Sequence, residues 1–60
     1  MRKVHLKAKS NRGIRVINDH GNLWTVSGGT AQYYLLTAPD TCEILLDVKY
    51  DEDFEVIKEV

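Results

Sequence analysis

Hydrophobic and polar residues alternate along the first nine positions of the chain. Val4, Leu6 and Ala8 are each flanked by charged or imidazole side chains. A period of two places such residues together on one face of a β-strand. The pattern therefore predicts a strand at 3–9 that turns one face towards a core.

The next stretch has the pattern of a β-hairpin. Two runs rich in β-branched and aromatic residues, 13–18 and 23–28, flank a turn-forming sequence at 19–22. Gly21 in that turn adopts positive φ without steric cost, and the flanking residue types suit a pleated, half-buried surface. We predict two paired strands here, with Trp24 on the core side.

A second hairpin is predicted at 33–38 and 42–50, where Pro39 presets the backbone for the turn between the strands. Apolar and charged residues alternate in the second of these strands. Leu45 is the exception, because it places an apolar side chain on the charged face. It is either an isolated surface residue or part of a subunit contact.

The last segment, 53–59, fits two structures. Phe54 begins an alternation of apolar and charged residues that is typical of a strand, whereas Phe54, Ile57 and Val60 have the spacing of one helical face. The segment is short for a helix and rich in β-branched residues. We therefore expect a strand.

Together these elements predict an all-β domain that occupies residues 1–60. We expect an antiparallel meander of five strands curled into a small SH3-like barrel with a short closing strand, because a closed barrel protects the edges that an open sheet exposes. The five strands are predicted at 3–9, 13–18, 23–28, 33–38 and 42–50, with the closing segment at 53–59. The predicted core consists of Val4, Leu6, Ile14, Val16, Trp24, Val26, Leu36, Ile44, Leu46, Val48 and Phe54.

Sixty residues provide only a small core. The single Cys42 excludes an internal disulfide, and Cys42, His5 and His20 form a structural zinc site only if a carboxylate or a second chain completes it. Small domains often gain stability from a second subunit, so we expect a weak homodimer. A lone cysteine, without a leader or a long apolar run, predicts a cytoplasmic protein that does not enter a membrane.

The net charge of −1 hides an asymmetry along the chain. The first 24 residues carry six basic side chains and one acidic one, and the remainder carries two basic and eight acidic. If the terminal strand packs beside the first, Lys3 and Lys7 face Glu55 and Glu59, and such cross-strand pairs favour that register. A basic nucleic-acid surface and an acidic docking surface are the alternatives.

Candidates for catalysis are few. His5 lies on the polar face of the first predicted strand and His20 lies in a turn, so we interpret both as solvated side chains. Cys42 is in phase with core residues and is interpreted as a small buried hydrophobe. The acidic run at 51–53 lacks the spaced ligands and the glycine of a calcium loop. We expect no catalytic, cofactor or metal site, and a protein that is not an enzyme.

Binding to another protein is the function that the pattern favours. Tyr33 and Tyr34 are adjacent, so in a strand they point to opposite faces and one of them is exposed. Exposed aromatic residues are typical of contact surfaces. We predict a small non-enzymatic interaction module whose candidate partner contacts are Tyr33, Tyr34, Leu45 and Tyr50.

Nucleic-acid binding is the alternative. Small β-barrels bind oligonucleotides by stacking bases on aromatic side chains beside basic ones. The candidate stacking residues are Trp24, Tyr33, Tyr34 and Tyr50. Trp24 would serve such stacking only if it were not a core residue. In this alternative the phosphate contacts are Arg2, Lys3, Arg12 and Arg15.

The segment from Gly13 to Val26, with its Asp-His-Gly turn followed by Leu-Trp-x-Val, resembles very small uncharacterised β proteins of bacteriophages. The resemblance covers about a third of the chain. It implies a compact β domain of viral or prophage origin that acts in the cytoplasm of a host cell by modulating a host protein. No functional residue carries over from it.

Overall fold

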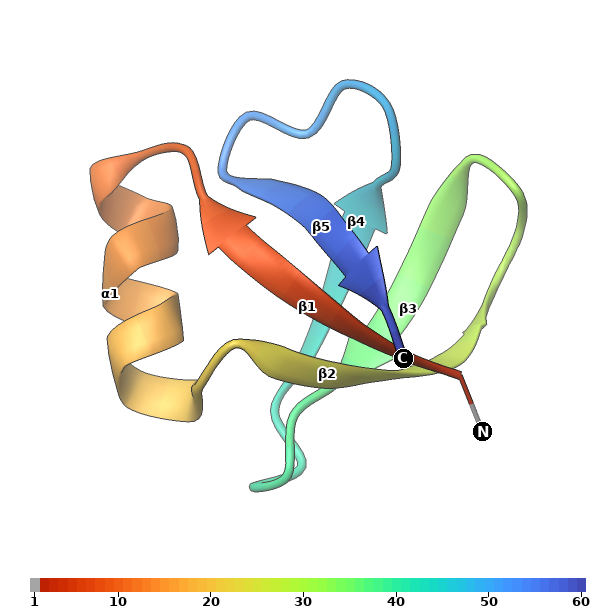
Figure 1. Cartoon of the computed structure of the whole chain (residues 1–60), viewed down its shortest axis with the longest axis horizontal. Coiled ribbons are helices and arrows are strands. Elements are labelled where there is room, and N and C mark those ends of the chain that lie inside the picture. The colour runs from red at the N-terminus through yellow and green to blue at the C-terminus, as the bar shows by residue number, and fades with distance from the viewer. Residues whose placement is uncertain (1) are drawn as a thin grey trace.

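Five strands and one helix make up the computed structural model, which describes residues 2–60 (Figure 1). The strands form one antiparallel sheet in the order β4-β3-β2-β1-β5. The all-β prediction is confirmed, but the sheet is not closed into a barrel within residues 2–60, because β4 and β5 are its two edges. The elements are β1 (Lys3–Ala8), α1 (Asn11–His20), β2 (Leu23–Gly29), β3 (Tyr33–Thr37), β4 (Glu43–Asp47) and β5 (Phe54–Glu59).

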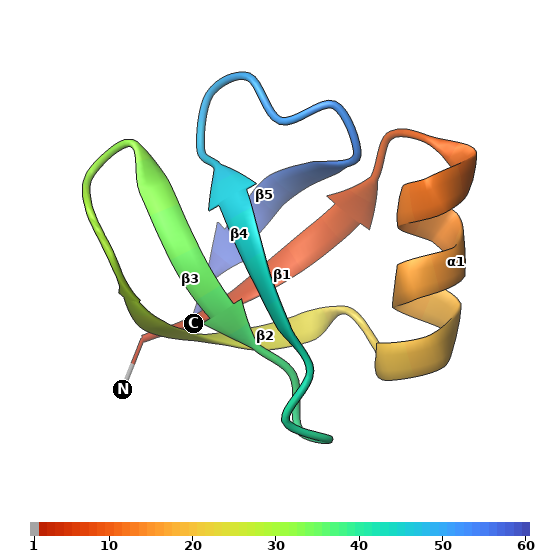
Figure 2. The same cartoon turned by 180° about the vertical axis from the view of Figure 1, so that it is seen from behind.

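The sheet is strongly curled. In Figure 1, β1 and β5 pass in front of β3 and β4, and Figure 2 shows the reverse order from behind, with β2 crossing between the two layers. Apolar side chains fill the space between the layers. The buried residues are Val4, Leu6, Trp24, Leu36, Ala38, Leu46 and Phe54.

Most of the predicted core is confirmed. Trp24 is fully buried, and its indole N–H donates to the carbonyl of Gly21 at 3.0 Å. Val16, Val26 and Ile44 are partly buried against the core. The prediction was wrong for Ile14, which is 50% exposed, and for Val48, which lies in the turn after β4 outside the core cluster.

The strand predicted at 13–18 is also wrong, because this segment lies in the helix α1. Ser10 caps the helix, and its Oγ accepts a hydrogen bond from the backbone N–H of Gly13 at 3.0 Å. The φ of Gly21 is positive, 87°, as the predicted turn requires. The residue ends a helix rather than joining two strands, because its N–H donates a hydrogen bond to the carbonyl of Ile17 at 2.8 Å. The first predicted hairpin is therefore a helix followed by a strand, α1 and β2.

The second hairpin is confirmed as β3 and β4, with Leu36 opposite Ile44. Its second strand is shorter than the predicted 42–50, because residues 48–50 form a turn. The last segment is a strand, as expected, and pairs with β1.

The charge asymmetry is explained in part by strand pairing. Lys7 lies opposite Glu55, as expected for a terminal strand beside the first. Glu59 lies opposite Val4 rather than Lys3, and its carboxylate pairs with Arg2. A β-bulge between His5 and Leu6 shifts the register of the β1–β5 pairing. The residues that lie opposite each other therefore differ on the two sides of the bulge.

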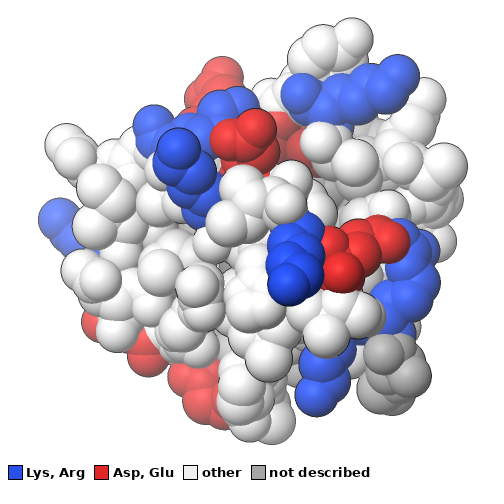
Figure 3. Space-filling view, in the orientation of Figure 1, with Lys and Arg blue, Asp and Glu red and all other residues white. Residues whose placement is uncertain are grey.

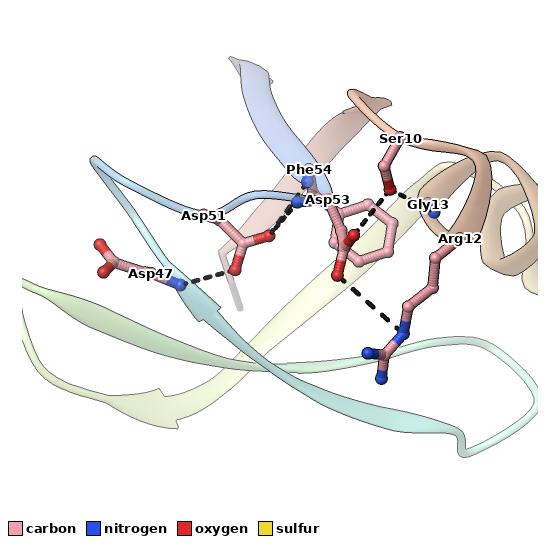
Figure 4. A network of polar contacts seen from close by, with 7 residues as sticks. All are labelled: Ser10, Arg12, Gly13, Asp47, Asp51, Asp53 and Phe54. Carbon is pink, nitrogen blue, oxygen red and sulfur yellow. Dashed lines mark hydrogen bonds and ion pairs between the residues drawn. The ribbon is translucent and has the colours of Figure 1, made fainter.

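Gly13 is where α1 meets the sheet. A Cβ atom built on Gly13 would lie 2.2 Å from the backbone carbonyl oxygen of Asp53, far inside van der Waals contact. The side chains around this contact reinforce it, because Ser10 Oγ donates to Asp53 Oδ1 at 2.6 Å (Figure 4). The helix can approach Asp53, the residue before β5, this closely only with glycine at position 13.

We expect Gly13→Ala to lower the free energy of unfolding by about 1–3 kcal/mol, the usual effect of overpacking. Helix propensity alone predicts the opposite sign, because alanine is favoured over glycine by about 1 kcal/mol within a helix. Urea denaturation checks the sign. Asn18→Ala, an exposed position of the same helix, serves as the control and should leave stability unchanged or slightly raised. Equal or greater stability of the Gly13→Ala protein would contradict the close contact.

Candidate functional site

Three of the four predicted partner contacts lie near one another. Tyr33 is opposite Asp47 and Leu45 is opposite Leu35, so Tyr33 and Leu45 are diagonal neighbours on one face of the β3–β4 pair. This is the outer face of the sheet, away from the core. The exposed fractions are 44% for Tyr33, 65% for Leu45 and 79% for Tyr50, which follows β4.

The fourth residue, Tyr34, points to the other face, as adjacency in a strand requires. It is half-buried against the core. Its hydroxyl accepts a hydrogen bond from Arg2 at 2.9 Å, and the Arg2 guanidinium lies over the Tyr34 ring, 5.0 Å from its centroid. Tyr34 therefore does not belong to the exposed surface with Tyr33.

The backbone of β4 has a free edge. The N–H of Ala38 donates to the carbonyl of Cys42, and the N–H of Val48 donates to the carbonyl of Gln32. Pairing alternates along an antiparallel ladder, so the even-numbered residues of β4 turn their backbone groups towards β3. The N–H and C=O groups of Glu43, Leu45 and Asp47 point away from the sheet.

Asp51 closes one end of this edge (Figure 4). Its Oδ1 accepts from the N–H of Asp47 at 3.2 Å, and its own N–H donates to the carbonyl of Asp47 at 3.1 Å. Its Oδ2 accepts from the N–H groups of Asp53 and Phe54, both at 3.0 Å. One carboxylate thus caps the end of β4 and the start of β5. In the described part of the chain, the backbone groups of Glu43 and Leu45 are left as the open edge of β4.

A cavity of about 290 Å³ lies beside the capped end. Asp47 Oδ1 accepts from the N–H groups of Lys49 and Tyr50, which holds the turn after β4. Asp47 Oδ2 accepts no hydrogen bond from residues 2–60. The cavity is lined by Ala31, Gln32, Tyr33, Asp47, Lys49 and Tyr50.

The residues of the nucleic-acid alternative do not form one patch. Arg2 and Lys3 lie at the start of β1, and Arg12 and Arg15 lie beyond its other end in α1, about 20 Å away along a six-residue strand. Arg2 is engaged by Glu59 and Tyr34, and these hydrogen bonds raise its pKa above the usual value, with Glu59 contributing most. Arg12 lies 4.0 Å from a carboxylate oxygen of Asp53. Figure 3 shows basic and acidic side chains intermixed over the face it presents.

His20 makes a contact that the sequence analysis missed. Its Nδ1 lies 2.5 Å from Asp40 Oδ2, which links the last turn of α1 to the β3–β4 turn. The pKa of Asp40 is lowered mainly by this hydrogen bond and next by the backbone N–H of Cys42. Twenty residues separate the partners, so no local sequence signal indicates the pair. His5 and Cys42 are half-buried, and no cluster of three metal-ligating side chains exists among residues 2–60.

No protein-family model, curated protein or solved structure matches this chain. The resemblance to small bacteriophage proteins therefore stays a prediction. The single helix described in residues 2–60, α1, is too short to cross a membrane.

We expect Asp51→Asn to lower the free energy of unfolding by about 1–3 kcal/mol, because an amide satisfies fewer of the three backbone N–H donors that the carboxylate accepts. The amides of Asp47 and Phe54 should exchange with solvent faster than in the wild type. Chemical denaturation and hydrogen exchange measure the two effects. Glu52→Gln, which removes a neighbouring exposed carboxylate, should change stability by less than about 0.5 kcal/mol. Equal effects of the two substitutions would contradict a specific cap.

Proposed function

We propose that this protein is a small non-enzymatic interaction module that binds another protein through the outer face of β3 and β4. The observation that carries the proposal is Leu45, which is 65% exposed on an edge strand. Tyr33 and Tyr50 extend the exposed surface from Leu45 to the cavity beside Asp47. Aromatic side chains are enriched in the contact surfaces of proteins.

An exposed hydrophobic side chain on an edge strand is a liability unless something covers it. Edge strands of monomeric proteins usually carry charges or bulges that prevent pairing with other chains. β4 carries charges only at its two ends, Glu43 and Asp47, and has no bulge in its pairing with β3, whereas β5, the other edge, carries a bulge in its pairing with β1. This difference supports β4 rather than β5 as the binding edge.

The proposal has four further parts that the order of the strands does not establish. They are an SH3-like barrel shape for the curled sheet with β4 left as an open edge, a bacteriophage origin, action on a host protein in the host cytoplasm, and a weak homodimer. The curl of the sheet supports the first of these, and the resemblance of the segment from Gly13 to Val26 supports the origin.

We expect the immobilised protein to retain a partner from a cell lysate in a manner that depends on Leu45. Leu45→Ser and Tyr50→Ser should lose most of this retention, because each removes exposed apolar surface from the proposed contact. Ile57→Ser is the matched control, since Ile57 is 57% exposed on the opposite edge strand, and it should retain the partner as the wild type does. Equal retention by all four proteins would contradict the proposed surface.

We expect single-stranded and duplex oligonucleotides to bind no more tightly than about 100 μM at physiological salt, the level of weak non-specific contact. The reason is that the basic residues of β1 and α1 are separated, and two of them face carboxylates. Fluorescence anisotropy at several salt concentrations measures the affinity. Micromolar binding with a steep loss of affinity as salt rises would establish the nucleic-acid alternative instead.

A further inference from the structure

The open edge of β4 presents backbone groups in the arrangement that an added strand requires. The N–H and C=O groups of Glu43 and Leu45 point away from β3, and Asp51 limits the edge to these two residues. An extended peptide that pairs with such an edge gains its affinity from main-chain hydrogen bonds, and its specificity from alternate side chains. The side chains beside the edge therefore determine which peptide fits.

The side chains on the outer face of β4 alternate between acidic and apolar. Glu43, Leu45 and Asp47 occupy alternate positions, so an acidic, an apolar and an acidic side chain share the outer face. Opposite charges placed directly across a strand pair are favourable, and like charges are unfavourable. The complement of this strand is a basic, an apolar and a basic side chain at alternate positions.

The cavity beside Asp47 fits the basic end of such a peptide. Tyr33 and Tyr50 supply two aromatic rings to its lining, and Asp47 supplies a carboxylate oxygen that accepts no hydrogen bond within residues 2–60. Lys and Arg side chains are attracted to aromatic faces and to carboxylates. Lys49 also lines the cavity, and its long flexible side chain can turn outwards to solvent.

A second copy of the chain fits this edge poorly. Antiparallel pairing of two β4 strands about Leu45 would place Glu43 of one copy opposite Asp47 of the other. Both residues are acidic, so this pairing brings like charges together at both ends. The charges of the edge thus select a partner of different sequence.

From these observations we infer that β4 binds an extended segment of another protein as an additional strand, and that this segment carries Lys or Arg on both sides of an apolar residue at alternate positions. The inference rests on the proposed function and specifies the partner's chemistry. Main-chain pairing occurs at Glu43 and Leu45. One basic side chain enters the cavity at Tyr33 and Tyr50, and the other lies opposite Glu43.

Three synthetic peptides test the inference. The first has the pattern Thr-Lys-Thr-Val-Thr-Lys-Thr, the second replaces both lysines with glutamate, and the third is the basic peptide with N-methyl groups on the amides that would pair with β4. Titration is followed by NMR of the full chain, through the amide shifts and the hydrogen exchange of Glu43 and Leu45.

We expect the basic peptide to bind about tenfold more tightly than the acidic one, a difference of about 1.4 kcal/mol, because two favourable cross-strand charge pairs are replaced by two unfavourable ones. Binding should slow amide exchange at Glu43 and Leu45 and leave β5 unchanged. N-methylation should abolish binding. Glu43→Lys should reverse or remove the preference for the basic peptide, whereas Asp19→Lys, the same charge change at an exposed position in α1, should preserve it.

Equal binding of the basic and acidic peptides, protection at β5 instead of β4, or binding that survives N-methylation would each overturn the inference. Protection of Leu45 that grows with protein concentration in the absence of peptide would assign the edge to a second copy. If no peptide binds while lysate retention still depends on Leu45, the inference fails and the proposed function stands. If retention does not depend on Leu45, the proposed function itself fails.

Discussion

The connection between β4 and β5 constrains the shape of the whole sheet. These strands are consecutive in the chain but lie at opposite edges, and in a flat sheet four strand spacings would separate them by about 19 Å. Residues 48–53 join them, and 48–50 form a turn. The hydrogen bond from the N–H of Asp51 to the carbonyl of Asp47 keeps the two ends of this turn within about 7 Å. The three Cα steps from Asp51 to Phe54 add at most about 11 Å even when fully extended. The sheet must therefore curl, and the curl encloses Trp24 between its two layers. The carboxylate of Asp51 holds the connection at both strands.

The parts of the fold that were predicted correctly depend on neighbours in sequence. Alternation along β1, β4 and β5 and the turn at Pro39 are local signals, and the structure contains these elements. The helix α1 was missed because its sequence is rich in β-branched residues, which favour a strand, and is followed by a turn-forming sequence. The residues that decide its conformation are Ser10, which caps it, and Gly13, which lets it approach Asp53. The second of these contacts joins residues forty positions apart, and no local pattern reveals it.

The candidate site divides in the same way. The exposure of Leu45 follows from a break in the alternation of its own strand, and the sequence predicts it. The free backbone groups beside it depend on which strand lies at the edge, and strand order is a property of the whole chain. The sequence predicts that Tyr33 and Tyr34 point to opposite faces. Tyr34 shares its face with the buried Leu36, two residues along the strand, so Tyr33 is the exposed one. The cap provided by Asp51 depends on a turn that shortens the predicted strand.

The pairing of β1 with β5 has a consequence for the order in which the chain folds. Lys3 accepts a hydrogen bond from Val60, so the first strand completes its pairing with the last (Figure 1). Closing so long a loop is entropically costly, and contacts of high sequence separation slow folding. The hairpin of β3 and β4 needs only local contacts and forms without this delay. During synthesis, β1 keeps one unpaired edge until residues 54–59 have been made, so the early chain passes through a stage in which a central strand of the final sheet is exposed to other chains.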